Sequence, residues 1–314
     1  MKNKKVLVTG TSGFLGKNLV SMFMGGTNFG VVSLSRKNLK LGETVTHLVY
    51  PNLLSVEEEE YINICQKYNI FAIIHCAGIS KEMGIPWSVY EQVNVVWPHR
   101  LCCVAKRLGI KFIFISSVGV YGTAPRFYPA QESHPYMPDG KYHRSKMLAE
   151  QFILSEMADG YSGKNMFILR LNALYGNGDN GVLIKLWKLY KLGILVCNFK
   201  AMTSFCSVDL VFEVVKKILN EEVAGPLICN VSEPAISFDS LHKLFSLHCK
   251  GKAVDISIFP NIGWVFRLWP WVYNKYALLF MHRVYNIKRL ELILDRQISA
   301  LENIGKYLGY YCGV

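Results

Sequence analysis

Residues Val6-Leu-Val-Thr-Gly-Thr-Ser-Gly-Phe-Leu-Gly16 decide the fold of this chain. Three apolar residues lead directly into a segment that contains Gly10, Gly13 and Gly16. A short apolar run that ends in glycine is typical of a buried parallel strand. Apolar residues then recur at helical spacing over 14–24. The stretch therefore predicts a strand, a tight turn and a helix.

The glycine spacing of this turn indicates a dinucleotide site. One glycine makes the turn, a second lets the backbone approach a pyrophosphate, and a third lets the helix pack closely on the strand. The unpaired N–H groups at the start of the helix would face the pyrophosphate. We therefore expect the cofactor to contact this segment at Gly10, Ser12, Gly13, Phe14, Leu15 and Gly16.

Strand and helix patterns continue to alternate along the chain. Strands are expected at 31–34, 45–50, 70–74, 111–115 and 166–171, and helices at 55–68, 88–108 and from 141 onward. This alternation predicts an α/β fold, a Rossmann-type doubly wound parallel sheet with right-handed crossovers. Ligands bind such sheets at the carboxyl ends of the strands.

The regular alternation weakens after Asn172. We therefore expect an NAD(P)-binding domain at 1–175 and a smaller, mainly C-terminal substrate-binding lobe at 176–314. The lobe is expected to be partly interleaved with the sheet, because the helix and strand patterns at 207–230 fit packing on it.

The end of the second expected strand bears on the choice of cofactor. An Asp or Glu there would accept a hydrogen bond from the adenosine ribose and repel a 2′-phosphate. This chain has Ser35-Arg36 instead, and Arg36 suits the phosphate of NADP. NADP(H) is therefore favoured and NAD(H) stays possible, while a plain solvated loop is the alternative for Arg36. Further expected cofactor contacts are Asn52, Leu53, Ala77, Gly78 and Asn94.

Several motifs in order carry a family resemblance. They are Thr9-Gly-x-x-Gly-x-x-Gly16, His75-Cys-Ala-Gly78, Asn94, Ser116-Ser117-x-x-Val-Tyr-Gly122 and Tyr142-x-x-x-Lys146. Over about residues 4–176 the chain resembles the extended short-chain dehydrogenase/reductase family, in the NAD-dependent epimerase/dehydratase branch that acts on nucleotide sugars. The resemblance implies hydride exchange at a sugar C4, and we also expect a homodimer.

The resemblance assigns catalysis to Ser117, Tyr142 and Lys146. Tyr142 and Lys146 lie one helical turn apart on one face. An unperturbed tyrosine has a pKa near ~10. A nearby ammonium and an oxidised nicotinamide would lower the pKa of Tyr142, the general acid and base. Lys146 would also hold the nicotinamide ribose, and Ser117 would hydrogen-bond the C4 oxygen. The alternative is that Tyr142 and Lys146 form an exposed surface pair.

The chain departs from its relatives at informative positions. Members that eliminate water between C4 and C6 carry Asp-Glu after the serine or threonine, whereas Val118-Gly119 follows Ser117 here, so a 4,6-dehydratase is not expected. Thr203 stands where relatives often place an arginine for the substrate diphosphate, so that contact would come from elsewhere. Asn52 replaces an Asp that faces adenine in many relatives, and its amide can still bind the ring.

Two enzymatic functions and one non-enzymatic function fit these residues. The favoured one is an NADPH-dependent reductase of nucleotide-linked 4-keto-6-deoxy sugars in surface-polysaccharide (O-antigen or capsule) biosynthesis. The alternative is an NAD-dependent 4-epimerase of UDP-hexose or UDP-N-acetylhexosamine. A non-catalytic dinucleotide-sensing scaffold is the third hypothesis, and the intact Ser117, Tyr142 and Lys146 argue against it.

Composition narrows the classes of partner and compartment. The chain has 314 residues, 51% hydrophobic and 18% charged, which allows a sizeable core. Its net charge is +12, but no long basic block or nucleic-acid motif occurs, so a phosphorylated ligand or a membrane surface is expected rather than nucleic acid. Nine scattered cysteines without a C-x-x-C pair indicate reduced thiols and no metal site. With no signal peptide apparent, a cytoplasmic location is expected.

The segment 256–285 is dense in aromatic residues, with Arg267, Lys275 and Arg283 among them. Pro260 and Pro270 interrupt it, so it makes a poor transmembrane span. Its composition fits peripheral contact with a membrane interface. A helical part of the substrate lobe or a dimer surface is the favoured alternative.

Overall fold

A computed structural model of the chain describes residues 4–40, 42–80, 84–158, 163–179, 181–256 and 270–312. The chain forms two compact units that are discontinuous in sequence. Unit 1 comprises Met1–Ser117, Lys141–Arg170 and Phe212–Ile228, and unit 2 comprises Val118–Gly140, Leu171–Val211 and Cys229–Val314. The chain thus passes between the units several times, whereas the sequence predicted a boundary after residue 175 with residues 207–230 packed on the sheet of the first domain.

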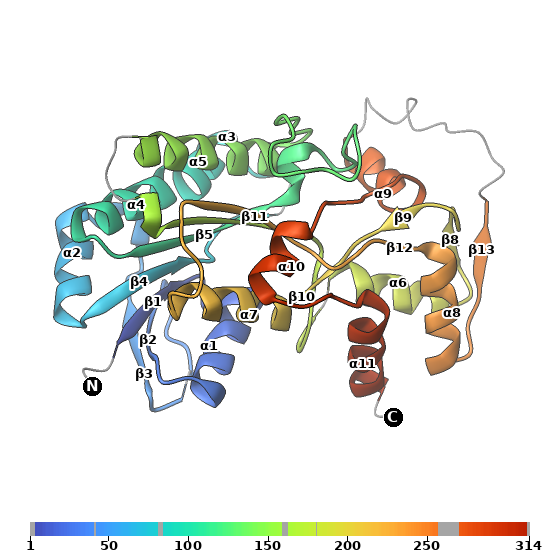
Figure 1. The fold of residues 1–314 in the computed structure, drawn as a ribbon, viewed down its shortest axis with the longest axis horizontal. Helices are drawn as coiled ribbons and strands as arrows, with labels where there is room; N and C mark the ends of the chain where they lie inside the picture. The colour runs from blue at the N-terminus through green and yellow to red at the C-terminus, as the bar shows by residue number, and fades with distance from the viewer. Residues whose placement is uncertain are drawn as a thin grey trace. The chain divides into compact units, whose positions relative to one another are not determined.

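A seven-stranded sheet forms the centre of the Rossmann fold, in the order β11-β6-β5-β4-β1-β2-β3 (Figure 1). Its strands are β1 (Lys5–Thr9), β2 (Gly30–Ser35), β3 (Val45–Val49), β4 (Ile70–His75), β5 (Lys111–Ser117), β6 (Met166–Leu171) and β11 (Leu227–Val231). β1 pairs in parallel with β2 on one side and with β4 on the other. The strand order therefore reverses between β1 and β4, where such sheets bind ligands. The predicted doubly wound parallel sheet is confirmed.

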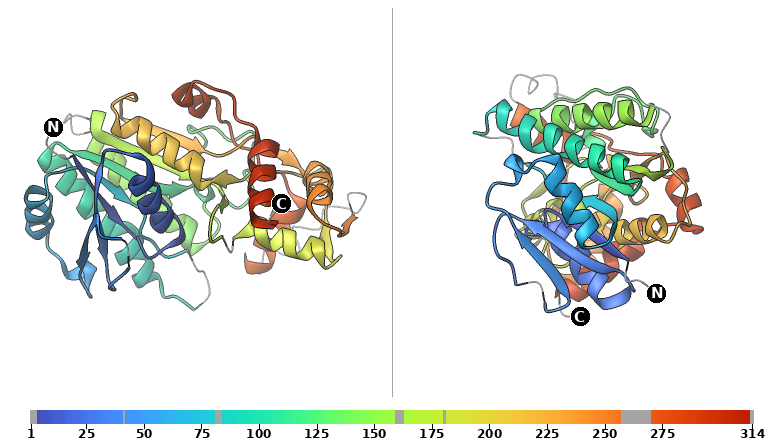
Figure 2. Two further views of the ribbon diagram at one scale, coloured as in Figure 1. Left: turned by 90° about the horizontal axis from the view of Figure 1, so that it is seen from below. Right: turned by 90° about the vertical axis from the view of Figure 1, so that its left-hand side faces the viewer.

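Helices cover both faces of this sheet (Figures 1 and 2). On one face lie α2 (Glu58–Lys67), α4 (Trp97–Leu108) and α5 (Lys141–Ala158), whose apolar sides share a core cluster with the strands. On the other face lie α1 (Phe14–Gly26) and α7 (Val208–Leu219), joined by an edge-to-face contact of Phe23 and Phe212 with ring centroids 5.2 Å apart.

Two helices differ from the sequence prediction. The expected continuous helix at 88–108 consists of α3 (Trp87–Tyr90), a π-helix at Glu91–Val96 and then α4. A π-helix has a wider turn, which changes the direction of the side chains that it carries. Helix α2 begins at Glu58 with Glu57 as its N-cap, and not at residue 55, where the sequence predicted its start. Ser55 ends a separate 3-10 turn at Leu53–Ser55.

Unit 2 has its own core, which packs large aromatic residues such as Trp187, Tyr190 and Phe245. Helices α6 (Val182–Lys191), α8 (Phe238–His248) and α11 (Ala300–Cys312) contribute to it, and α9 (Pro270–Phe280) and α10 (Lys288–Leu294) lie between α8 and α11 in the chain. The described residues of the unit also form three short strand pairs: β7 (Leu174–Tyr175) with β10 (Cys206–Ser207), β9 (Met202–Thr203) with β12 (Ile236–Ser237), and β8 (Leu195–Cys197) with β13 (Ala253–Asp255).

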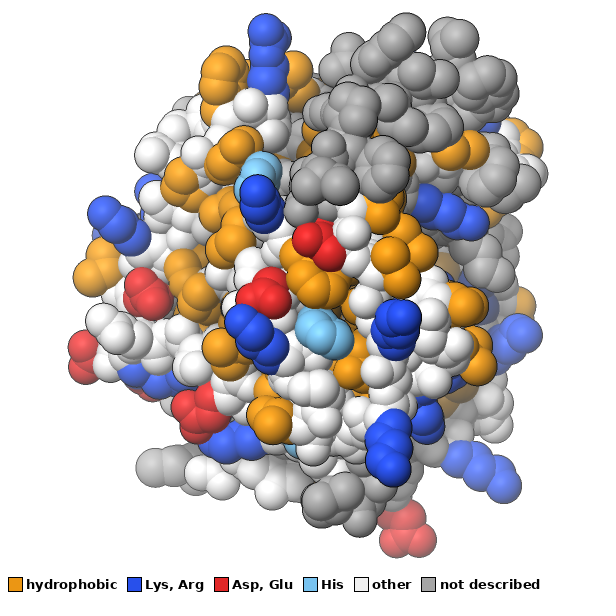
Figure 3. All heavy atoms as spheres, turned by 90° about the vertical axis from the view of Figure 1, so that its right-hand side faces the viewer, with side chains coloured by type: hydrophobic (Ala, Val, Ile, Leu, Met, Phe, Trp, Pro, Cys, Tyr) orange, Lys and Arg blue, Asp and Glu red, His pale blue; other side chains and the backbone are white. Residues whose placement is uncertain are grey.

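The positive charge of the chain is dispersed on the face drawn in Figure 3. Lys and Arg side chains of described residues stand apart there, with hydrophobic side chains between them. In the aromatic segment 256–285, residues 257–269 lie outside the described residues, and α9 covers Pro270–Phe280. Among the residues that the structure describes, no helix combines the length and the apolar character needed to cross a membrane.

Candidate active site

A cavity of about 250 Å³ lies in unit 1 at the carboxyl ends of β1, β2 and β4. Eight of the predicted cofactor contacts line it: Gly10, Ser12, Gly13, Arg36, Asn52, Leu53, Ala77 and Gly78. The lining also includes residues that were not predicted as cofactor contacts: Leu34, Ser35, Pro51, Leu54, Cys76, Ile79, Val93 and Trp97. Most of these lining residues lie at the end of a strand or directly after one. Their place at the strand ends is the sequence signal from which they could have been predicted.

The glycines of the first turn have distinct structural roles. Gly10 has φ of +71°, and a Cβ there would lie 2.6 Å from the backbone nitrogen of Ala77. The N–H of Gly13 donates to the carbonyl of Gly10 at 2.9 Å and closes the turn. A Cβ on Gly16 would collide with the same carbonyl, so Gly16 lets α1 pack on β1. Leu15 is buried in the core.

The start of α1 suits an anionic group. Gly13 is its N-cap, no side chain caps the helix, and the first turn has no acidic residue. Phe14 begins the helix, while Ser12 and Gly13 are exposed and line the cavity. The positive end of the helix dipole is therefore available to a pyrophosphate at this point. These features fit a bound dinucleotide.

The end of β2 presents a cation to the cavity. Arg36 is exposed and lines it, next to the buried Ser35. The hydroxyl of Ser35 donates to the carbonyl of Lys37 at 2.5 Å, which shapes the turn that carries Arg36. None of the described residues that line the cavity is an Asp or Glu. The lining is therefore compatible with a 2′-phosphate on the adenosine ribose.

The segment that contains Asn52 and Leu53 is held in place by the helices behind it. The hydroxyl of Tyr61 donates to the carbonyl of Leu53 at 2.8 Å, and Trp97 Nε1 donates to that hydroxyl at 3.0 Å. Arg100 donates to the carbonyl of Leu54 at 2.9 Å. These bonds fix the wall of the cavity where the resemblance places the adenine.

Ser117 and Tyr142 meet through their side chains. Ser117 is the last residue of β5, Tyr142 is the second residue of α5, and their hydroxyls are hydrogen-bonded. Burial raises the pKa of Tyr142 to about 12, and the hydrogen bond from Ser117 opposes this rise. The predicted lowering of this pKa is therefore not found in the protein alone, because desolvation of the phenolate outweighs the hydrogen bond from Ser117.

Lys146 is buried, with only 4% of its surface exposed. Its Nζ donates to the carbonyl of Ile115 at 2.7 Å and lies 4.6 Å from the ring centroid of Phe114. Burial lowers its pKa to about 8. A Cβ on Gly78 would lie 3.5 Å from this Nζ. Lys146 is thus directed into the end of the sheet next to Gly78, and the alternative of an exposed surface pair with Tyr142 is wrong.

Asn94, on the π-helix, connects the β4 loop to α5. Its Oδ1 accepts from the N–H of Ile79 at 2.8 Å, and its Nδ2 donates to the carbonyl of Ile79 at 2.9 Å and to the hydroxyl of Ser145 at 2.8 Å. These bonds orient the loop beside Gly78 relative to the helix that carries Tyr142. In this structure Asn94 is a positioning residue behind the cavity.

A buried ion pair, which was not predicted from the sequence, anchors α5. Glu150 is fully buried, and its Oε2 lies 2.6 Å from Nη2 of Arg170 on β6. The hydroxyl of Ser116 donates to Oε1 of Glu150 at 2.5 Å. Since Glu150 is one helical turn beyond Lys146, this pair helps to hold the face of α5 that carries Tyr142 and Lys146 against β5.

The arrangement provides a set of groups for chemistry at an alcohol or carbonyl. The phenol of Tyr142 can exchange a proton, and the hydroxyl of Ser117 can share hydrogen bonds with the same oxygen. The ammonium of Lys146 lies one turn along the same helix and next to Gly78 of the cavity wall. Groups of this kind, beside a dinucleotide cavity, suit transfer of hydride with a coupled transfer of a proton.

Similar proteins are known. An N-acetyl-alpha-D-glucosaminyl-diphospho-ditrans,octacis-undecaprenol 4-epimerase of Escherichia coli O157:H7 is 24% identical over 246 residues, which cover 76% of this chain and 70% of that enzyme. A UDP-glucose 4-epimerase of Vibrio cholerae is 28% identical over 197 residues, or 61% of this chain and 58% of that enzyme.

Solved structures and a family profile complete the comparison. A structure of MoeE5 in complex with UDP-glucose and NAD has a TM-score of 0.73 at 18% identity, with 98% of each chain covered. The sequence profile of the NAD dependent epimerase/dehydratase family matches residues 6–231, which include the glycine turn, Ser117, Tyr142 and Lys146. With the fold and motifs described above, this match shows that the chain belongs to the NAD dependent epimerase/dehydratase family.

Proposed function

We propose that this chain is a nucleotide-sugar 4-epimerase that uses a nicotinamide dinucleotide to oxidise and re-reduce the sugar at C4. The observation that carries the proposal is the hydrogen bond between Ser117 and Tyr142 at the end of β5, beside Lys146. The similarity to 4-epimerases of lipid-linked N-acetylglucosamine and of UDP-glucose supports this choice of reaction over the reductase that the sequence favoured.

Tyr142, Ser117 and Lys146 have different roles in the transfer of the proton. Tyr142 takes the proton of the C4 hydroxyl as this carbon is oxidised, and it returns the proton when the carbon is reduced. Ser117 donates to the oxygen as its charge develops. Lys146 supplies a positive charge near the phenolate and is suited to hold the nicotinamide ribose. The bound dinucleotide supplies the hydride acceptor and donor.

A reductase is the second candidate, because Arg36 lines the cavity and no carboxylate does among the described residues. This lining supports NADP(H), which suits net reduction by an external supply of reductant. The substrate would then be a nucleotide-linked 4-keto-6-deoxy sugar, and the same three catalytic residues would act. NAD(H) fits the epimerase, whose cofactor is regenerated within each turnover.

One assay separates the candidates. The purified protein is incubated with UDP-, dTDP-, CDP- and GDP-sugars, with and without added NADPH, and the products are identified by NMR. The epimerase predicts a C4 epimer without added reductant, and the reductase predicts turnover of a 4-keto sugar only with NADPH. Tight binding of a dinucleotide without any turnover would contradict both and would favour the scaffold hypothesis.

We further propose peripheral membrane contact through the aromatic segment 256–285 and assembly as a homodimer. The membrane proposal is supported by the composition of that segment, which combines aromatic residues with Arg267, Lys275 and Arg283. Flotation of the protein with anionic and neutral liposomes tests the membrane proposal, and lipid-independent behaviour would contradict it.

Light scattering coupled to size exclusion tests the proposed homodimer, and a monomeric mass at all concentrations would contradict it.

A further inference from the structure

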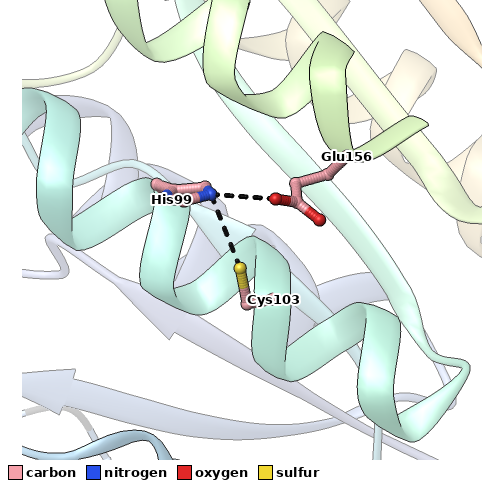
Figure 4. Close-up of side chains that lie close together, drawn as sticks. All are labelled: His99, Cys103 and Glu156. Carbon is pink, nitrogen blue, oxygen red and sulfur yellow. Dashed lines mark hydrogen bonds and ion pairs between the residues drawn. The ribbon is translucent and has the colours of Figure 1, made fainter. Parts of the chain in front are cut away.

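A cluster of potential metal ligands lies outside the candidate active site, between α4 and α5. His99 and Cys103 extend from α4 and Glu156 from α5, and their side chains point toward one another (Figure 4). Nε2 of His99 is 3.1 Å from Oε1 of Glu156 and 3.6 Å from Sγ of Cys103. The three atoms all lie within 4.8 Å of one another.

The separations of 3.1 Å and 3.6 Å from Nε2 of His99 to the other two donors suit a tetrahedral zinc ion. Zn²⁺ binds nitrogen and oxygen at ~2.0–2.2 Å and sulfur at ~2.3 Å, so that neighbouring ligand atoms lie ~3.5 Å apart. His99 and Cys103 are four residues apart on one helix, which places both on one face. A nitrogen, a thiolate and a carboxylate oxygen are a donor set that zinc accepts.

The surroundings of the cluster orient its donors. The ring of His99 stacks on Phe152 of α5 at a centroid distance of 5.0 Å. Nζ of Lys106 lies 2.9 Å from Oε2 of Glu156, which leaves Oε1 directed toward His99. Partners of this kind fix the orientation of ligands around a metal. All three ligand residues are half-buried, so an ion can enter from solvent and a water molecule can complete the coordination.

An ion-pair network without metal is the competing explanation. His99 and Lys106 both contact the carboxylate of Glu156, and their contacts lower the pKa of that carboxyl. This explanation gives the thiol of Cys103 no role, although the thiol lies against the same nitrogen that faces the carboxylate. The cation of Lys106 would weaken the attraction of the cluster for a metal, and this effect distinguishes the two explanations experimentally.

We propose that His99, Cys103 and Glu156 bind one Zn²⁺ ion, with water as the fourth ligand, and that the ion joins α4 to α5. The thiol of Cys103 loses its proton to solvent when the zinc–sulfur bond forms. The sequence predicted no metal site, because its cysteines are scattered without a C-x-x-C pair, and the third ligand of this cluster comes from a different helix. The site is structural: the ion stabilises the pairing of α4 with α5, the helix that carries Tyr142 and Lys146.

Metal titration of the tag-free protein tests the proposal. Zn²⁺ binding is measured by competition with a chromogenic chelator, and Co²⁺ is used as a spectroscopic probe. We expect one Zn²⁺ per chain, and a sulfur-to-cobalt charge-transfer band that shows thiolate coordination. Cys103→Ser should weaken Zn²⁺ binding by at least ~10-fold and abolish the band. Cys249→Ser, at another half-buried cysteine, should change neither.

Two more variants keep the test decisive. His99→Gln should weaken Zn²⁺ binding as Cys103→Ser does. If circular dichroism shows that Cys103→Ser does not fold, His99→Gln serves as the test variant instead. Lys106→Met removes the competing cation and should tighten Zn²⁺ binding, whereas an ion-pair network alone predicts no saturable site in any variant. Equal Zn²⁺ affinity in the wild type and Cys103→Ser, or a Co²⁺ complex without the thiolate band, would overturn the proposal.

Discussion

The hydroxyl of Ser117 at the end of β5 is hydrogen-bonded to the phenol of Tyr142 at the start of α5. The two residues are far apart in sequence, and the parallel sheet brings them together where its strands end. Their contact moderates a pKa that burial raises to about 12. A phenol with this pKa is protonated at neutral pH and is ready to act as an acid. It requires additional positive charge before it can act as a base.

Replacement of Ser117 tests this relationship. Ser117→Ala should reduce kcat by ~100-fold, because the reacting oxygen loses a donor. It should also move the acidic limb of the pH–rate profile, which deprotonation of the base Tyr142 sets, to higher pH, because the hydrogen bond from Ser117 lowers the pKa of Tyr142 and is lost in the variant. Steady-state kinetics across pH measure both effects. Ser155→Ala, on the exposed side of the same helix, is the matched control. An unshifted profile would argue against the contact.

The side chain of Arg36 tests the choice of cofactor. Arg36→Ala should weaken NADP(H) binding by ~10–100-fold, the range for loss of a charge-assisted hydrogen bond, and should leave NAD(H) binding nearly unchanged. Fluorescence titration with both reduced dinucleotides measures the ratio. Lys37→Ala, at the exposed neighbouring position, controls for the general loss of a positive charge. Equal losses for the two cofactors would remove the support for NADP(H).

The buried pair of Glu150 and Arg170 provides a test of how α5 is held. Glu150→Gln should destabilise the protein by about 3–5 kcal/mol, because it leaves the guanidinium of Arg170 buried without its counter-charge. Denaturant unfolding measures the loss. Glu59→Gln breaks the exposed pair with Arg107 and should have little effect. Similar stabilities for these two variants would show that the buried pair does not anchor the helix.

A carboxyl in unit 2 should make stability depend on pH. Glu233 is buried, its Oε1 accepts from Tyr175 at 2.7 Å and from Asn303 at 3.0 Å, and burial raises its pKa from 4.5 to about 7. The native state therefore holds this proton more tightly than the unfolded state. The resulting stability is complete below pH 4.5 and is lost as the pH rises through 7, by up to ~3 kcal/mol.

Thermal unfolding at pH 5 and pH 8 checks the direction in which stability changes with pH. The melting temperature of the wild type should fall between these pH values by more than that of Glu233→Gln, which keeps a neutral side chain at the position. Glu302→Gln, on the exposed face of α11, should retain the wild-type pH dependence. A wild-type melting temperature that rises from pH 5 to pH 8 by more than that of Glu233→Gln would contradict the assignment.

Local sequence patterns were enough to predict the sheet and the places of Ser117, Tyr142 and Lys146 at the ends of its elements. The apolar run before Gly10 and the alternation of strands and helices are properties of short segments, and parallel sheets place the ends of their strands together. The i, i+4 spacing of Tyr142 and Lys146 likewise depends only on helix geometry. Because these features depend only on residues that are close together in the sequence, the structure reproduces them.

Features that depend on distant contacts could not be predicted in the same way. The π-helix at Glu91–Val96 adds a wider turn that apolar periodicity does not reveal, and it orients Asn94 toward Ile79 and Ser145. Glu150 resembles an ordinary exposed helical residue until its partner on β6 is known. The pKa of Tyr142 depends on burial, which no spacing rule supplies.

The most direct test of the central claim follows deuterium from C4 of a UDP-hexose. Wild-type protein and Tyr142→Phe are incubated with the 4-deuterated substrate without added reductant, and the products are examined by NMR. Tyr310→Phe, at an exposed tyrosine of unit 2, is the control. We predict that the wild type and the control form the C4 epimer with deuterium still on C4. Tyr142→Phe should keep its fold and dinucleotide binding, but its turnover should fall by ~10²–10⁴-fold. Undiminished epimerisation by Tyr142→Phe, or loss of the C4 deuterium to solvent, would contradict the account.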